Sequence, residues 1–169
     1  KISSWFSNVD SLRIVKLPNT VTEIGESAFY GAPIEEINFP TSLTTIGSSA
    51  FYNNRLKIID LSATKLTTIN NSFGDAVHFV YVWICKKIKK KPVKLPETVT
   101  TLGDGAFSNC YITEINFPSG LTSISRNALN YCQIDTLRLP ATVTEIGNNA
   151  FNYAKFDCVE IPSTVTKIN

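Results

Sequence analysis

The residues with the most distinctive chemistry in this 169-residue chain lie together between Gly74 and Lys94, in the stretch GDAVHFVYVWICKKIKKKPVK. Two aromatic residues precede a lysine cluster there: Tyr81, Trp83, Lys86, Lys87, Lys89, Lys90, Lys91 and Lys94. The lysines carry +6 whereas the whole chain carries +2, so the positive charge is local. Cations beside aromatic rings can bind a sulfated glycan, another anionic polymer or an acidic protein surface. The alternative is a solvated loop whose lysines protect an exposed strand from pairing with other chains.

Patterns typical of catalysis and metal binding are missing. The single histidine, His78, has no Ser or Cys nucleophile beside it in a motif. Glu35 and Glu36 are adjacent on an expected strand, so they point to opposite sides, which is poor geometry for paired acid-base catalysis. Neither Cys85 nor Cys158 has metal-ligand spacing with another cysteine or with His78. We therefore expect no enzyme activity, no cofactor and no bound metal.

Two further cysteines share one position of a sequence repeat. Cys110 and Cys132 occupy the register that holds Ala32 and Ala154 in other copies, and small residues there indicate an interior site. Neighbouring rungs of a parallel stack are about 4.8 Å apart, which exceeds the ~3.8 Å Cβ separation of a disulfide. Two buried thiols are favoured, with a disulfide as the alternative. Cys158 is expected on the outer face of a strand.

The elements that position these residues come from an internal repeat. The unit LPNTVTEIGESAFYGAPIEEIN has copies that begin at Leu17, Phe39, Leu61, Leu95, Phe117, Leu139 and Ile161. The copies are evenly spaced in the sequence, except that the step from Leu61 to Leu95 is longer than the others. Such a period is the signature of a solenoid, in which each copy forms one rung. We expect one domain over residues 1–169 with about seven rungs and an insertion at about 85–94. Because the chain begins and stops within a repeat, we also expect it to be a fragment of a longer protein.

Each copy predicts two short strands and a turn. The set Ile34, Ile37 and Phe39 has the form I-x-x-I-x-F, which alternates as a half-buried strand does, and a proline usually follows and ends it. A second strand is expected at the threonine-rich V-T-x-I segment. The regular spacing of four glycines predicts a turn with positive φ at these residues: Gly25, Gly47, Gly103 and Gly147. One helical turn is expected at pairs such as Ala28-Phe29, with the phenylalanine in the core.

The long step between copies contains one more candidate strand. Phe79, Val82 and Ile84 reproduce the strand spacing, so Val80 to Ile84 is interpreted as the rung strand of the third repeat. Tyr81 and Trp83 would then face outward. Val93 and Leu95 are expected to form the following rung, which exposes Lys94.

Alternation along the first strands predicts two columns of outward side chains. One column contains Ile14, Glu36, Ile58, Tyr81 and Glu114, and the other contains Asn38, Asp60, Trp83, Asn116 and Arg138. Neither column places like charges on adjacent rungs, where the spacing of about 4.8 Å would make them destabilising. The mixture has no single electrostatic sign and is typical of a protein-binding surface. These residues, together with the lysine cluster, are our candidate partner-binding residues.

The pattern L-x-x-I-x-(L/F)-P followed by V-T-x-I-G-x-x-A-F-x-x-C resembles the bacterial leucine-rich repeat family of BspA-like, Treponema-type surface proteins. The resemblance covers roughly residues 12–73 and 93–169. It implies an α/β, β-rich, right-handed leucine-rich-repeat solenoid with a parallel sheet on one face and short strands, turns and helical turns on the other. It also implies a secreted or cell-surface protein without catalytic residues, associated with adhesion to host proteins, cells and other bacteria.

Three functions follow as hypotheses. The first is a protein-interaction or adhesion module of a bacterial surface or secreted protein, with a host extracellular or cell-surface protein as its partner. The second is a module that binds a glycan or anionic polymer through the aromatic and lysine-rich insertion. The third is a structural spacer. No nucleic-acid partner is expected, and no apolar run is long enough to span a membrane.

Overall fold

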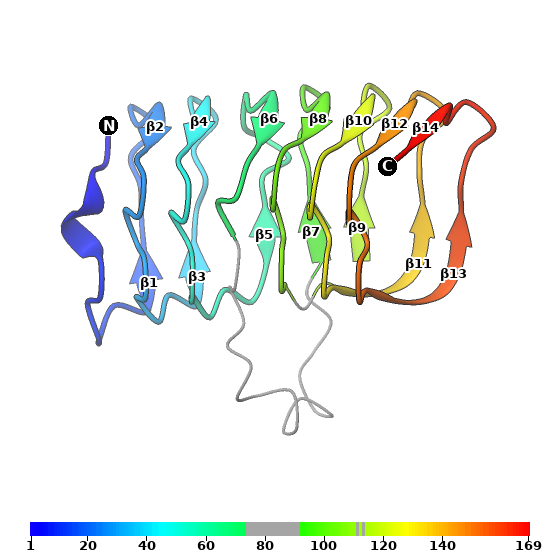
Figure 1. The fold of residues 1–169 in the computed structure, drawn as a ribbon. Coiled ribbons are helices and arrows are strands. Elements are labelled where there is room, and N and C mark those ends of the chain that lie inside the picture. The colour runs from blue at the N-terminus through cyan, green and yellow to red at the C-terminus, as the bar shows by residue number, and fades with distance from the viewer. Residues whose placement is uncertain (74–91, 111, 113) are drawn as a thin grey trace.

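The computed structural model describes residues 1–73, 92–110, 112 and 114–169, which form a stack of rungs with two columns of short strands (Figure 1). The first column contains β1 (Ile14–Val15), β3 (Glu36–Ile37), β5 (Ile59–Asp60), β7 (Pro92–Lys94), β9 (Glu114–Asn116), β11 (Gln133–Arg138) and β13 (Lys155–Glu160). The second column contains β2 (Glu23–Ile24), β4 (Thr45–Ile46), β6 (Thr68–Ile69), β8 (Thr101–Leu102), β10 (Ser123–Ile124), β12 (Glu145–Ile146) and β14 (Lys167–Ile168). A 3₁₀ helix, η1 (Ser4–Phe6), precedes the strands.

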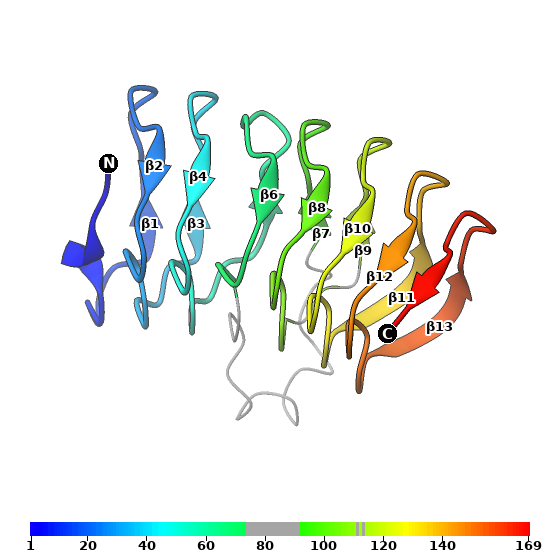
Figure 2. The ribbon, with the colours of Figure 1, turned by 45° about the horizontal axis from the view of Figure 1, so that its top comes forward.

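Equivalent residues of successive rungs lie side by side in both columns. In the first column Val15 is the parallel partner of Ile37, and Val93 is the partner of both Ile59 and Ile115. In the second column β6, β8, β10, β12 and β14 form one five-stranded parallel sheet. Figure 2 shows the same succession of rungs from a second direction. The prediction that the copies stack and share one apolar interior is confirmed, and both expected strands of the repeat are present.

The strand expected at Val80 to Ile84 is not a rung between β5 and β7. These two strands pair directly, with Ile59 beside Val93, so no further strand fits between them. Spacing alone could not exclude that rung, because residues 79–84 are rich in strand-forming residues and match the apolar pattern. Residues 80–84 themselves lie outside the described residues. Val93 does belong to a rung with Lys94 exposed, as expected, and the predicted insertion ends before Pro92.

A column of stacked phenylalanine rings runs through the interior. The rings of Phe29, Phe51, Phe73 and Phe107 are at most 1% exposed. Neighbouring rings of this column have centroids 5.2–5.5 Å apart and planes within 18° of parallel. Phe39 packs edge-on against Phe51 at 5.6 Å. The first four copies therefore each add one ring to a continuous core, whereas the fifth copy has a leucine at this register. Stacked and edge-on contacts are the favourable geometries for such rings.

The expected helical turn at the Ala-Phe pairs is wrong. A residue with left-handed backbone precedes each pair, with φ of 51° at Ser27 and 55° at Ser49. Alternate N–H groups of the turn form hydrogen bonds outside it. Ser27 and Phe29 donate to carbonyl oxygens of the next rung, whereas Ala28 donates to the Gly25 carbonyl oxygen within the turn. An α-helix needs every N–H within its own ladder. The fold is a β-solenoid in which η1 is the only helix among the described residues.

The four repeat glycines serve a purpose other than the predicted one. Gly25, Gly47, Gly103 and Gly147 do not have positive φ. They allow adjacent rungs to approach closely, since a Cβ on Gly25 would lie 2.7 Å from the carbonyl oxygen of Ile2 and one on Gly147 would lie 2.9 Å from the Arg126 nitrogen. The left-handed position is instead occupied by residues such as Ser27.

Candidate functional site

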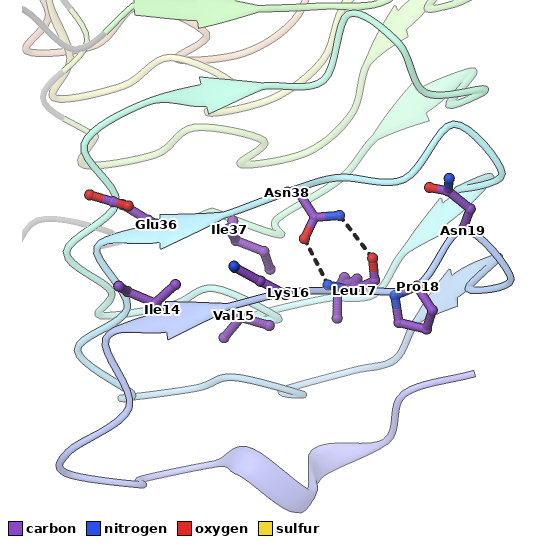
Figure 3. A pocket seen from close by; sticks show the side chains of 9 residues that line it. All are labelled: Ile14, Val15, Lys16, Leu17, Pro18, Asn19, Glu36, Ile37 and Asn38. Atoms are coloured by element: carbon purple, nitrogen blue, oxygen red, sulfur yellow. Dashed lines mark hydrogen bonds between the residues drawn. The ribbon is translucent and has the colours of Figure 1, made fainter.

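The outward side chains of β1 and β3 border an open pocket of about 600 Å³ (Figure 3). Its lining consists of Ile14, Val15, Lys16, Leu17, Pro18, Asn19, Glu36, Ile37 and Asn38. Figure 3 shows Ile14 and Glu36 at one end and Pro18 and Asn19 at the other. The pocket therefore brings together three of the residues predicted to bind a partner, namely Ile14, Glu36 and Asn38.

Asn38 holds the wall of this pocket in place. Its side-chain oxygen accepts from the Leu17 N–H at 2.7 Å, and its side-chain nitrogen donates to the Leu17 carbonyl oxygen at 2.8 Å. Asn116 holds Leu95 in the same way, with bonds of 2.8 and 3.4 Å. The sequence identifies both asparagines as candidate partner-binding residues from their outward direction alone. Their side-chain groups are already engaged with the neighbouring rung, so they shape the surface more than they offer free donors.

A charged network lies beside the pocket. The Glu35 carboxylate pairs with Arg13 at 2.6 Å and with Lys57 at 2.8 Å, and Lys57 also lies 3.4 Å from Glu36. Hydrogen bonds first from Lys57 and then from Arg13 hold the pKa of Glu35 below its usual range. Hydrogen bonding to Glu35 in turn raises the pKa of Lys57. Three successive rungs are joined by these side chains, and their charges are largely matched within the chain.

Replacing Lys57 by glutamine should raise the pKa of Glu35 toward the ordinary glutamate value, because its largest stabilising partner is lost while Arg13 remains. A carbon-detected NMR titration of the Glu35 carboxyl measures this midpoint. Since the folded-state pKa is depressed, the pairing stabilises the fold above the unfolded-state pKa and is lost as the pH falls through the folded-state pKa. Lys65→Gln is the control, and an equal shift in that variant would contradict the assignment.

Two isoleucines stay exposed on either side of this network. Ile14 is 59% exposed and Ile58 is 53% exposed, on the rungs before and after Glu36. We call the outward side chains of the first three first-column strands and their flanking residues the N-terminal face, defined as Ile14, Lys16, Glu36, Asn38, Ile58 and Asp60. This face combines exposed apolar side chains, ion-paired carboxylates at Glu36 and Asp60, and a pocket.

The remaining predicted residues lie farther along the column or outside the described residues. Lys94 pairs with Asp60 at 3.0 Å, and Arg138 pairs with Glu160 at 3.1 Å. A hydrogen bond from the Ser62 hydroxyl, followed by Lys94, lowers the pKa of Asp60. Glu114 is exposed on β9. Tyr81, Trp83, Lys86, Lys87, Lys89, Lys90 and Lys91 lie outside the described residues, so their role stays a prediction. The column order is corrected, because Lys94 and not Trp83 stands between Asp60 and Asn116.

The interior cysteines have a structural role. Cys110 and Cys132 are buried and form no disulfide, and their thiols donate to the carbonyl oxygens of Phe73 and Phe107 at 2.9 and 3.1 Å. Burial raises the pKa of the Cys132 thiol well above its ordinary value. Asn54, which shares their register, donates to Phe29 in the same way at 2.8 Å. The expectation of buried thiols is confirmed, and Cys158 is exposed as predicted.

Sequence reasoning missed several residues that build the N-terminal face. Arg13, Glu35 and Lys57 occupy one register of three successive rungs and alternate in sign, a signal visible in the printed sequence but not used. Lys16 lines the pocket beside Ile14. Lys16 shares the outward register of Asn38 and Asp60, but nothing in the sequence indicates that a pocket lies at this rung. The role of Asn54 could have been found from its register with the two cysteines.

The described parts of the chain hold neither a candidate metal centre nor a membrane-spanning helix. No group of three or more His, Cys, Asp or Glu side chains there is placed to hold a metal ion. The described residues also contain no helix with the length and hydropathy needed to cross a bilayer.

Known bacterial proteins share this repeat and this fold. A family model described as BspA type leucine rich repeat region, with 6 copies, matches residues 2–90 and 81–169. The crystal structure of a leucine rich cell surface protein from Faecalibacterium prausnitzii is similar, with 30% identity, a TM-score of 0.68, and coverage of 93% of this chain and 38% of that protein. No curated protein matches the chain.

Two other crystal structures are more distant. A leucine-rich repeat protein from Bacteroides ovatus has 20% identity and a TM-score of 0.47 over 96% of this chain and 56% of that protein. The pneumococcal vaccine antigen PcpA has 18% identity and a TM-score of 0.49 over 89% of this chain and 31% of that protein. The chain thus spans about a third to a half of the length of these proteins.

Proposed function

We propose that this chain, which belongs to the BspA-type leucine-rich repeat family, is a non-catalytic protein-interaction module of a bacterial surface or secreted protein. Its partner is a protein, and a host extracellular or cell-surface protein is the class that fits an adhesion role. The similar protein from Faecalibacterium prausnitzii is described as a cell surface protein, which supports this location. The partner binds the N-terminal face.

The observation that carries this proposal is the pair of exposed isoleucines beside matched charges. Burying Ile14 and Ile58, at 59% and 53% exposure, removes apolar surface from water and favours association. Glu36 already lies 3.4 Å from Lys57, so a partner covering this rung need not supply the counter-charge itself. An unpaired buried charge would strongly oppose binding. An apolar centre within a polar surround is also the usual anatomy of a protein interface.

The experiment uses the double variant Ile14→Asp and Ile58→Asp. Binding of the chain to immobilised extracellular-matrix proteins and to cultured epithelial cells is measured by surface plasmon resonance and flow cytometry. The double variant should weaken binding by about tenfold or more, because central apolar anchors dominate interface energies. Ile168→Asp is the matched control, since this isoleucine is 65% exposed but lies on β14 of the other column. Circular dichroism confirms that all variants fold.

Three outcomes would contradict the proposal. Binding that is equal in the double variant and the wild type would exclude the N-terminal face. The absence of saturable binding would favour a spacer. Binding that weakens steeply between about 0.1 M and 1 M salt would favour an anionic polymer, because screening acts mainly on exposed charges.

A further inference from the structure

Two tyrosines form an exposed stack on the turns that precede β11 and β13. The rings of Tyr131 and Tyr153 have centroids 4.8 Å apart and planes 17° from parallel. Tyr131 is 45% exposed and Tyr153 is 68% exposed. Although the two rings stack on each other, part of the Tyr131 side chain and most of the Tyr153 side chain remain open to solvent. This pair lies outside the N-terminal face and plays no part in the proposed function.

The backbone at both tyrosines is unfavourable for a bulky side chain. The φ angle is 56° at Tyr131 and 54° at Tyr153. Other rungs place Gly31, Asn53 and Asn109 at this register, with φ of 68°, 56° and 58°. Glycine and asparagine adopt this left-handed conformation readily, whereas a bulky residue there is an outlier. Residues held in strained backbone conformations cluster at ligand-binding sites.

Burial does not explain why tyrosine stands here. The other tyrosine stack, Tyr30 with Tyr52 at 5.0 Å, lies one residue earlier in the repeat, and both of its rings are half-buried. Neither of those residues has positive φ. The chain therefore builds a packed tyrosine stack without strain in its first two copies. In two later copies the chain has an exposed tyrosine stack, and both of its residues have strained backbone conformations.

The two turn segments that carry the exposed pair contain polar residues and no charged residue. The segments 127–131 and 149–153 read NALNY and NAFNY, with two asparagines each and no acidic or basic residue. They run side by side, since the Leu129 and Tyr131 N–H groups donate to Ala150 and Asn152 at 2.8 and 2.9 Å. Aromatic faces pack against the C–H faces of sugar rings, and amides donate to and accept from sugar hydroxyls. A phosphate or sulfate ligand would call for cations.

We infer that the Tyr131–Tyr153 stack is a binding site for a neutral glycan, with a sugar ring packed on the open tyrosine surface. The exposed asparagines of the second turn, Asn149 and Asn152, supply hydrogen bonds to its hydroxyl groups. The site uses neither the isoleucines of the N-terminal face nor the lysine cluster of the sequence.

The test is affinity gel electrophoresis of the 169-residue chain in gels that contain a mixed-linkage β-glucan, an arabinoxylan or a galactomannan, with heparin as the charged comparison. The chain should be retarded in at least one neutral gel. The double variant Tyr131→Asn and Tyr153→Asn should weaken that binding by about tenfold or more. Tyr131→Phe with Tyr153→Phe keeps the rings and should bind within a few-fold of wild type. Trp5→Ala, which removes an aromatic side chain that is 78% exposed elsewhere, should bind as wild type does.

A stability measurement separates binding from a purely structural role. Because asparagine suits the left-handed register, the Asn double variant should keep or raise the Tm while glycan binding falls. A lower Tm in that variant would assign the stack to folding and overturn the proposal. So would retardation in heparin alone, retardation that persists in the Asn variant, or no retardation in any neutral gel. The protein-binding experiment on Ile14 and Ile58 is independent of these results.

Discussion

Replacing Phe51 by alanine should lower the free energy of unfolding by about 3–5 kcal/mol, the range for a buried phenylalanine that leaves a cavity. Phe51 is fully buried and stacks on Phe29 at 5.4 Å and on Phe73 at 5.2 Å. Phe39 also meets it edge-on. In a solenoid each rung is stabilised by its two neighbours, so one substitution weakens two interfaces. Urea denaturation followed by circular dichroism measures the loss.

Phe151→Ala is the matched control for this prediction. Phe151 occupies the same register in a later copy but is only partly buried, and it makes an edge-on contact with Phe156 at 5.7 Å. The Phe151→Ala variant should lose clearly less free energy of unfolding than Phe51→Ala, because the substitution removes less buried surface and leaves a smaller cavity. Equal losses in the two variants would show that the ring column does not hold the rungs together.

Replacing Gly47 by alanine should destabilise the fold by about 1–3 kcal/mol, the cost typical of forcing extra volume into a packed interior. The added Cβ would press on the backbone of Gly25 and Glu26 in the preceding rung, and backbone cannot yield as a flexible side chain can. The two rungs must separate, which lengthens the bond of 2.8 Å from the Gly47 N–H to the Ile24 carbonyl oxygen. Thermal and urea denaturation quantify the effect.

Gly120→Ala is the comparison for this second prediction. A Cβ there meets nothing closer than the Glu97 carbonyl oxygen at 3.9 Å, and Gly120 does not have positive φ. Alanine should therefore be neutral or should stabilise by about 0.4–1 kcal/mol through a less flexible unfolded chain. If Gly47→Ala behaved like Gly120→Ala, close approach of the rungs would not be the reason for glycine at position 47.

Much of the fold could be predicted because the repeat copies both strand patterns in phase. Ile37, Ile59 and Phe51 are inward in every interpretation that keeps the period, and the burial of Ile59 and Phe51 and the partial burial of Ile37 agree with this. The prediction that Val80 to Ile84 form a rung between β5 and β7 is wrong, because β5 pairs directly with β7. An apolar pattern indicates only that a segment suits a strand and does not determine which strands pair. The glycine prediction failed for a related reason. Glycine is required both by left-handed backbone and by close packing, and one sequence cannot distinguish them.

The sequence predicts which side chains of the candidate site point outward, but not which of them form ion pairs and hydrogen bonds. Alternation placed Ile14, Glu36 and Ile58 outward, as the structure has them. Which charges meet depends on side-chain conformations and on neighbours in the adjacent rungs, so the pairing of Lys57 with both Glu35 and Glu36 was not anticipated. The hydrogen bonds of Asn38 to Leu17 were missed for the same reason.

The direct pairing of β5 with β7 makes the third repeat a permissive position for sequence variation. The two strands stay in register although the step between their copies is longer than every other step of the repeat. By loop-closure scaling this extra length costs only about 0.4 kcal/mol, far less than the loss of one core ring. The register of β5 and β7 is therefore expected to tolerate a change in the length of this connection at little cost in free energy. The same position is the natural choice for grafting a foreign peptide onto the scaffold.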